Sequence, residues 1–158
     1  MMEGDPRTLP ASPPSEVEWE DLLVRLEIMP RALRVAMEDA SADSDAVARA
    51  LRSGVAMEAV LQVMLEAMVD GRDLSAPDAK GAGVSPSGSP QELLAEYARL
   101  RMRNFVMVQR RGLNVWEWTV RGGPFHGATA YQLFQFAAKS DGALLAAIRR
   151  AGRAEPAA

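Results

Sequence analysis

The chain has 158 residues, a length typical of a single domain, with 48% hydrophobic and 25% charged residues. Its formal net charge of −3 excludes the strongly basic surface that is typical of nucleic-acid-binding proteins. With no cysteine and one histidine, the chain excludes disulfides, thiolate zinc sites and sites that need two imidazoles from one copy. These counts favour a soluble globular domain that lacks the commonest catalytic side chains.

The N-terminal segment, residues 1–14, is rich in proline and small residues and contains no apolar run. It predicts a flexible tail and excludes a signal peptide within these residues. No later stretch approaches the roughly 18 apolar residues that a membrane span needs, so cytoplasmic localisation is the default expectation. The predicted domain covers residues 15–152, and residues 153–158 are expected to form a frayed tail.

The first predicted helix begins at Ser15 or a neighbouring residue. Acidic residues occupy its first turns, where they complement the helix dipole. Pro30 lies within the pattern and is expected to kink or divide the helix, because proline has no N–H to donate. Apolar residues recur at steps of three and four and form one stripe, namely Trp19, Leu22, Leu23, Leu26, Met29, Leu33 and Met37.

Residues 41–54 predict a turn followed by one short helix. Ser53 then resembles the cap of a second, longer helix that ends near Gly71. Residues 72–88 carry glycine, proline, serine and aspartate, which are typical of a long loop. The apolar stripe of the longer helix comprises Met57, Val60, Leu61, Met64, Leu65 and Met68.

Two capping boxes mark the starts of the remaining helices. Ser89-Pro90-Gln91-Glu92 opens one helix, which ends at Arg110-Arg111-Gly112. Thr129 and Gln132 open the last helix, which continues to Gly152, and residues 113–128 predict an irregular, partly extended connection before it. Four helices that each carry one apolar stripe are best buried against one another, so the sequence predicts an all-α four-helix bundle.

Three segments give the chain a resemblance to the DinB/YfiT-like superfamily of metal-binding four-helix bundles. They are the first helix with Trp19 and Pro30, the segment RRGLNVWEWTVRGGPFHGATAYQLFQF, and the final-helix segment KSDGALLAAIRRA. The resemblance covers residues 16–152 and implies the family's bundle fold. It also implies a homodimer, as in many members of the family.

The chain departs from that family at the metal site. The resemblance implies one histidine from the second helix and two from the last helix at i and i+4, a spacing that places both on one face. Here the last-helix positions are Ser140 and Leu144, and the second-helix position lies within a residue or two of Val63. Of the signature only Asp141 remains. We therefore expect no metal, no cofactor and no metal-dependent thiol transfer or hydrolysis.

The candidate catalytic groups are few. Asp141 is either a pocket carboxylate that binds a cationic or hydroxylated ligand or acts as an acid/base, or a partly buried residue paired with an arginine or a backbone group; the second interpretation is favoured because a catalytic partner is missing. Glu27 and Glu66 could supply a second carboxylate, although charges on amphipathic helices usually face solvent. His126 is either an acid/base group or, preferably, a loop histidine bonded to backbone. A pair of Ser140 with His126 has no supporting motif.

Trp116 and Trp118 could line a cleft beside Tyr131 and Phe134 if their segment is extended, but large aromatics more often close the end of a bundle. The methionines of the second helix are interpreted as core filling. Several arginines of the third helix are expected on its solvated face, namely Arg99, Arg101, Arg103, Arg110 and Arg111.

The sequence thus favours a protein without metal chemistry that binds a small apolar molecule or a protein partner in the bundle cleft. A metal-independent enzyme that uses Asp141 and a purely structural protein with a filled core are the alternatives. No nucleic-acid or membrane partner is expected. The predicted pocket residues are Val63, Asn104, Trp116, Tyr131, Ser140, Asp141 and Leu144.

Overall fold

The computed structural model describes residues 4–39, 44–74 and 86–153. Within these ranges the chain is all-helical apart from its loops and one isolated bridge between Thr119 and Thr129. The all-α prediction is therefore confirmed. The elements are η1 (Pro6–Thr8), α1 (Glu16–Asp39), α2 (Ser44–Asp70), α4 (Pro90–Gln109), η2 (Gly112–Glu117) and α5 (Ala130–Arg153).

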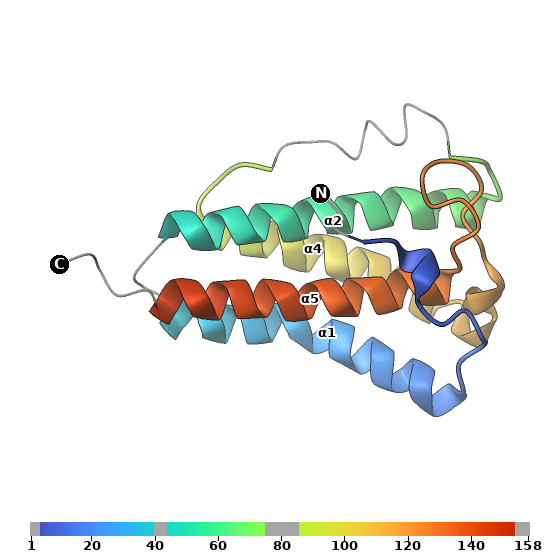
Figure 1. The fold of residues 1–158 in the computed structure, drawn as a ribbon, viewed down its shortest axis with the longest axis horizontal. Coiled ribbons are helices and arrows are strands. Elements are labelled where there is room, and N and C mark those ends of the chain that lie inside the picture. The colour runs from blue at the N-terminus through green and yellow to red at the C-terminus, as the bar shows by residue number, and fades with distance from the viewer. Residues whose placement is uncertain (1–3, 40–43, 75–85, 154–158) are drawn as a thin grey trace.

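The four helices pack side by side (Figure 1). Helix α2 packs against α4 and α5, and α1 packs against the same two helices from the other side. In Figure 1, α1 and α5 run in one direction while α2 and α4 run in the other. Helices α1 and α2 therefore run antiparallel, as do α4 and α5, whereas α2 and α4 run parallel. None of the described helices is long and apolar enough to cross a membrane.

Local capping sets three of the four helix starts, as the sequence predicts. A side-chain oxygen at the cap accepts a hydrogen bond from the backbone N–H three residues later, which satisfies a donor that has no partner within the helix. At α1 and α5 the third residue also bonds back to the cap, completing the capping box. The bonded pairs are Ser15 with Glu18, Ser89 with Glu92, and Thr129 with Gln132.

The prediction of a separate short helix before Ser53 is wrong, because α2 is one continuous helix. Gly54 lies within this helix. It allows close packing against neighbouring helices and does not end a helix. A Cβ atom at Gly54 would lie 2.8 Å from Cδ2 of Leu144 and 3.4 Å from the Tyr97 ring. The missing side chain therefore allows α2 to approach both α5 and α4 closely.

Pro30 does not divide α1, which continues from Glu16 to Asp39. Helix α1 changes direction near its middle, as Figure 1 shows, so the alternative prediction of a kink agrees with its course. Of the predicted loop at residues 72–88, residues 75–85 lie outside the described part of the chain.

The segment before α1 lies against α5. The side-chain amide of Gln132 donates to the Leu9 carbonyl oxygen at 2.8 Å, and that of Gln135 donates to the Pro10 carbonyl oxygen at 2.8 Å. Pro6 is buried. Residues 4–10 thus have tertiary contacts that their composition, typical of a flexible tail, did not indicate. Of the predicted C-terminal tail, residues 154–158 lie outside the described part.

The core consists of two apolar clusters. The first includes Trp19, Leu26, Leu61, Leu65, Leu133 and Phe134, and the second includes Leu33, Leu51, Leu93, Leu100, Leu144 and Ile148. Met57 and Met64 are buried in the first cluster and Met68 packs against it, which confirms the core-filling interpretation. Along α2, α4 and α5 the boundary between the clusters carries buried polar side chains: Glu58, Arg101, Asn104 and Asp141.

Candidate functional site

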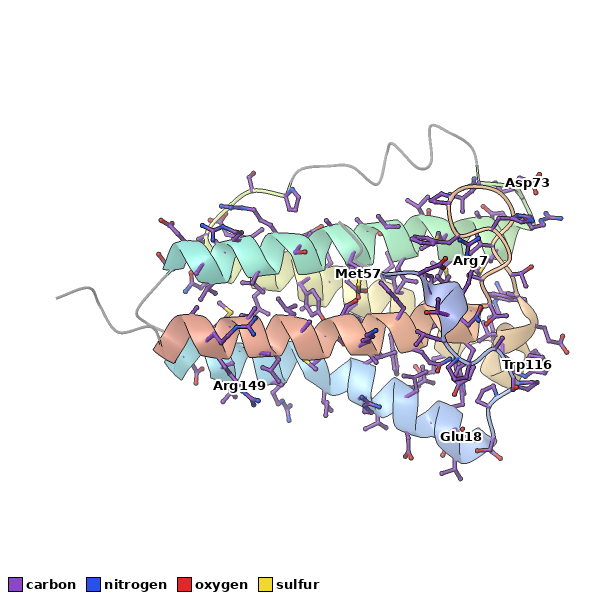
Figure 2. The ribbon with its side chains drawn as sticks, in the orientation of Figure 1. Arg7, Glu18, Met57, Asp73, Trp116 and Arg149 are labelled. Carbon is purple, nitrogen blue, oxygen red and sulfur yellow. The ribbon has the colours of Figure 1, made fainter. Side chains whose placement is uncertain are left out.

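A groove of about 600 Å³ lies between α2 and α5. We call it the α2–α5 groove. Figure 2 shows Met57 between these two helices. The apolar lining comes from Gly4, Ala50, Gly54, Met57, Phe136, Ala143, Leu144 and Ala147, and the polar lining comes from Ser53, Tyr97, Lys139, Ser140 and Asp141.

Asp141 joins the groove to a set of buried polar groups. Its side chain is 2% exposed. Tyr97 Oη donates to Asp141 Oδ1 at 2.5 Å, while Arg101 donates to both carboxylate oxygens at 2.7 Å. The interpretation of Asp141 as the partner of an arginine is therefore confirmed. Both of its oxygens are occupied by partners within the protein.

Arg101 uses all five of its N–H donors inside the bundle. Two bonds reach Asp141, two reach Oε1 of Glu58 at 3.0 and 2.6 Å, and one reaches the carbonyl oxygen of Leu26 at 2.9 Å. The guanidinium group on α4 therefore bonds to α1, α2 and α5. In Figure 1, α4 is seen in the space between α2 and α5.

The expectation that Arg101 faces solvent is wrong, because its side chain is 3% exposed. Its position explains the burial: Tyr97, Arg101, Asn104 and Val108 follow one another at steps of four, three and four along the buried face of α4. The other arginines named with it are exposed, as expected: Arg99, Arg103, Arg110 and Arg111.

Glu58 and Asn104 complete what we call the buried network, namely Glu58, Tyr97, Arg101, Asn104 and Asp141. Glu58 is fully buried, and Asn104 Nδ2 donates to its Oε2 at 3.0 Å and to its backbone oxygen at 3.1 Å. Asn104 Oδ1 is the only buried side-chain polar atom without a partner in the described ranges. Every other buried side-chain donor and acceptor of the network is thus satisfied.

Burial and the contacts of the network shift the pKa values of Tyr97 and Arg101. Burial raises the pKa of Tyr97 well above its ordinary value, so this side chain stays a neutral hydrogen-bond donor. Burial would lower the pKa of Arg101, but attraction to Glu58 and the hydrogen bonds to Asp141 outweigh it and raise that pKa. The cation therefore stays charged under all ordinary conditions.

Three of the seven predicted pocket residues, Ser140, Asp141 and Leu144, line the α2–α5 groove. Val63 is not among the lining residues. The α2 residues at the groove include Ser53, Gly54 and Met57, which lie earlier in the helix. Helix α2 is continuous from Ser44 to Asp70, and its first half, not the region of Val63, borders the groove beside Ser140 and Leu144.

Three other predicted pocket residues lie elsewhere. Asn104 belongs to the buried network, and Tyr131 packs edge-on against Trp19 with ring centroids 6.2 Å apart. Trp116 lies at the end of the bundle opposite Arg149 (Figure 2). It packs with Trp118 against the first apolar cluster, and the extended conformation considered for this pair is wrong because Trp116 lies in η2.

The suggested partners of Asp141 are also apart from it. Glu27 is exposed, and Glu66 accepts hydrogen bonds from Gln62 at 3.0 Å and Arg103 at 3.3 Å. His126 Nδ1 accepts from the backbone N–H of Gly122 at 2.8 Å, which confirms its interpretation as a loop histidine. The structure therefore does not pair Asp141 with Glu27, Glu66 or His126, the acid/base partners that the sequence suggested.

Sequence reasoning missed Glu58 and the role of Tyr97 and Arg101. A usable signal was present, because each charged residue of the network occupies an apolar-stripe position of its helix. Glu58 continues Leu51 and Val55, and Asp141 follows Phe134 and Ala137 at helical spacing. A charge inside an apolar stripe predicts a buried ion pair, since an unpaired charge is costly to bury.

The groove residues do not fit the metal that the resemblance implies. Ser140 offers one hydroxyl, Leu144 offers no ligand, and both carboxylate oxygens of Asp141 are bonded to Arg101. Among the described residues there is no group of three or more His, Cys, Asp or Glu side chains suited to a metal ion. We therefore derive no metal-dependent chemistry from this arrangement.

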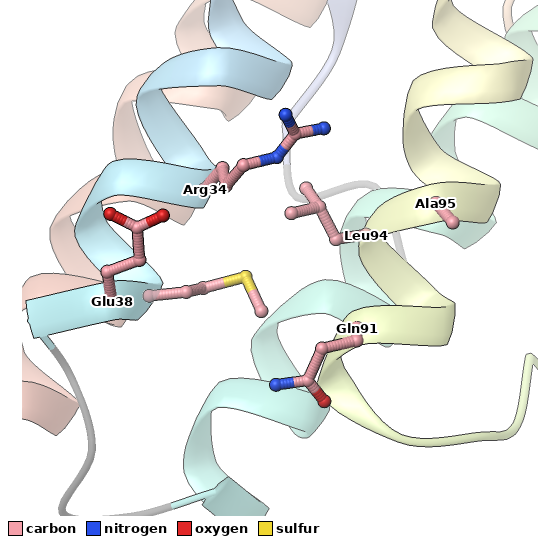
Figure 3. A pocket seen from close by; sticks show the side chains of 6 residues that line it. Arg34, Glu38, Gln91, Leu94 and Ala95 are labelled. Atoms are coloured by element: carbon pink, nitrogen blue, oxygen red, sulfur yellow. The ribbon is translucent and has the colours of Figure 1, made fainter.

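A second hollow of about 310 Å³ lies between the end of α1 and the start of α4 (Figure 3). Its charged residues, Arg34 and Glu38, are exposed. It does not border the buried network, whereas the α2–α5 groove is lined by Tyr97 and Asp141 of that network. Its lining residues are Arg34, Met37, Glu38, Gln91, Leu94 and Ala95.

Comparisons with protein-family models, with curated proteins and with solved structures gave no match to the chain.

Proposed function

We propose that this protein is a DinB-like helical bundle without the family's metal site, and that it binds a small, largely apolar molecule in the α2–α5 groove. The observation that carries the proposal is the groove itself. Its volume of about 600 Å³ falls within the range of small-molecule sites, roughly 300–1,000 Å³. The DinB-like assignment rests on the three sequence segments that carry the resemblance.

The lining suggests the chemistry of the ligand. Met57, Phe136 and Leu144 supply apolar surface, while Ser140 and the exposed Lys139 supply a hydroxyl and a cation at the same groove. An apolar molecule with one carboxylate or hydroxyl group would bury its hydrocarbon part and keep its polar group near Lys139. The carboxylate of Asp141 is unavailable to such a ligand because Arg101 and Tyr97 occupy it.

The same contacts favour binding over catalysis at Asp141. A general base must come within hydrogen-bond reach of the substrate proton, whereas the Asp141 side chain is only 2% exposed. Here the carboxylate accepts three hydrogen bonds from a cation and a phenol, and its suggested partners lie elsewhere. The groove also favours ligand binding over a purely structural role, for which we would expect a filled core.

Binding can be tested with the fluorescent anion 1-anilinonaphthalene-8-sulfonate, which has an apolar body and one charged group. Ala143 and Ala146 are both exposed on α5, but Ala143 lines the groove and Ala146 does not. We expect Ala143→Phe to weaken binding of the dye by about tenfold or more, and Ala146→Phe to leave it unchanged. Equal affinity in both variants, with unchanged helical circular dichroism, would exclude the groove as the binding site.

The metal-free part of the proposal has its own test. Elemental analysis of the purified protein should find nickel, zinc and iron well below one ion per chain. One equivalent of a divalent ion that is lost in the Ser140→Ala variant would contradict it.

A further inference from the structure

Residues 4–10 lie against α5 beside the α2–α5 groove, and we call them the N-terminal strap. Figure 1 shows η1, the middle of this strap, at the end of the bundle where α5 begins. The Asp5 side chain caps η1 by accepting from the backbone N–H of Arg7 at 2.9 Å, and it also pairs with the Arg7 guanidinium group at 2.6 Å. These local bonds hold the strap in one compact turn.

The strap is attached to the bundle by a small number of contacts. The side-chain amides of Gln132 and Gln135 on α5 donate to the carbonyl oxygens of Leu9 and Pro10. The apolar anchors of the strap are the buried Pro6 and the half-buried Leu9, which packs against the first apolar cluster. An attachment of this kind opens locally at a smaller free-energy cost than the packed helices do.

The strap supplies one wall of the groove. Gly4 is among the lining residues, and a Cβ placed on it would lie 3.5 Å from Cε2 of Phe136, another lining residue. The backbone of the strap therefore passes close to this ring. A ligand at this end of the groove would contact the strap as well as α2 and α5.

We propose that the N-terminal strap is a movable wall of the ligand site, so that docking of the strap and binding in the α2–α5 groove strengthen each other. The docked strap adds contacts and keeps water from the apolar surface near Phe136. A ligand that binds the docked form more tightly must shift the strap toward that form by the same factor, because the coupling is reciprocal. The inference rests on the groove being the ligand site, as proposed above.

Dye binding to two charge-matched variants tests the wall. Pro6→Asp/Leu9→Asp places a charge on both apolar anchors and should undock the strap. Ala11→Asp/Ser12→Asp adds the same charge to two exposed residues just beyond it. We expect the first variant to bind 1-anilinonaphthalene-8-sulfonate about tenfold more weakly than the wild type, and the second to match the wild type. Unchanged or tighter binding in the first variant would overturn the proposal.

Trypsin cleavage after Arg7 measures docking of the strap in the unaltered chain. Trypsin needs an extended segment, so it cuts the undocked form, and the rate follows the population of that form. Saturating dye should slow this cut by about tenfold, the factor by which undocking weakens dye binding. In Ala143→Phe, which fills the groove, the same dye concentration should have little effect. Equal rates with and without dye in the wild type would exclude the coupling.

The failure of this proposal differs from the failure of the proposed function. If Ala143→Phe leaves the affinity for the dye unchanged, the groove is not the binding site and both proposals are wrong. If Ala143→Phe weakens binding but Pro6→Asp/Leu9→Asp does not, the groove binds the dye and only the role of the strap is wrong.

Discussion

Arg101 donates a hydrogen bond from Nη1 to the carbonyl oxygen of Leu26, at 2.9 Å. In a regular α-helix this carbonyl would accept from the N–H of residue 30, but Pro30 has no N–H. The proline of α1 therefore exposes a backbone acceptor toward the core, and a buried guanidinium group from α4 satisfies it. A sequence feature that looks like a local defect is thus part of a contact between two helices.

The same guanidinium group joins Glu58 of α2 and Asp141 of α5. Buried ion pairs often add little net stability, because desolvation offsets their attraction. Their geometric demands are strict, however, since five donors must meet acceptors on three other helices. We infer that the buried network selects the relative register of the four helices.

The contact between Arg101 and Leu26 predicts a coupling between Arg101 and Pro30. Arg101→Met leaves the Leu26 carbonyl without a donor, whereas Pro30→Ala restores a helical N–H in reach of it. The loss of stability caused by Arg101→Met should be smaller by about 1 kcal/mol in the Pro30→Ala background. Urea unfolding of the two single variants and the double variant measures this coupling. Strictly additive effects would argue against it.

Removal of Arg101 alone should lower the unfolding free energy far more than joint replacement of Glu58, Arg101 and Asp141. Arg101→Met leaves two buried carboxylates uncompensated and should cost about 3–5 kcal/mol of unfolding free energy. The triple variant Glu58→Leu/Arg101→Met/Asp141→Leu should recover most of that loss. The exposed Arg99, which pairs with Glu96, is the matched control, and Arg99→Met should cost less than about 1 kcal/mol. Chemical denaturation distinguishes these cases; a triple variant no more stable than Arg101→Met would contradict the argument.

Tyr97 should make the protein less stable at alkaline pH. Its folded-state pKa is raised by burial, so the unfolded tyrosine ionises near pH 10 while the folded one does not. Its stabilising contribution is fully present below pH 10, and above it the unfolding free energy should fall by about 1.4 kcal/mol per pH unit. In a Tyr131→Phe background Tyr97 is the only tyrosine of the chain.

The measurement compares Tyr131→Phe with Tyr97→Phe/Tyr131→Phe by urea unfolding between about pH 8 and about pH 11. The difference in stability between the two proteins should shrink as the pH rises through about 10. A constant difference across this range would show that Tyr97 ionises equally well in the folded state.

Two helical glycines should respond in opposite directions to alanine. A Cβ at Gly54 meets Leu144 at 2.8 Å, so Gly54→Ala should destabilise the protein by about 1–3 kcal/mol through overpacking. Nothing lies within 4 Å of a Cβ at Gly142 on α5, so Gly142→Ala should stabilise it by about 0.5–1 kcal/mol. Thermal unfolding compares the two. Because Leu144 can be shortened, Gly54→Ala/Leu144→Ala should relieve the clash, and stabilisation by Gly54→Ala alone would refute the packing role.

Much of the fold could be predicted because its signals are local. Ser15, Ser89 and Thr129 cap their helices within one turn, and the apolar stripes of α1, α4 and α5 repeat at helical spacing. The start of α2 was missed because Gly54 resembles a local terminator. Its actual role depends on Leu144, a residue on another helix.

Of the candidate site, the sequence identified Asp141 as a residue paired with an arginine or a backbone group, but not which of these partners it has. Arg99, Arg101 and Arg103 lie close together on one helix, and only packing against three other helices decides that Arg101 is the buried one. The position of Glu58 opposite Arg101 similarly depends on the register between α2 and α4.

The sequence by itself determined the helical class, three of the helix starts, the absence of cysteine and the absence of histidine at the expected ligand positions, because these follow from residue type and from contacts within a few residues. Only the tertiary structure decided that Pro30 frees an acceptor for Arg101, that Gly54 admits Leu144, and that Ser140 and Leu144 face the first half of α2. Each of these relationships joins residues far apart in the chain. Their distances are set by how complete helices pack, which local periodicity does not encode.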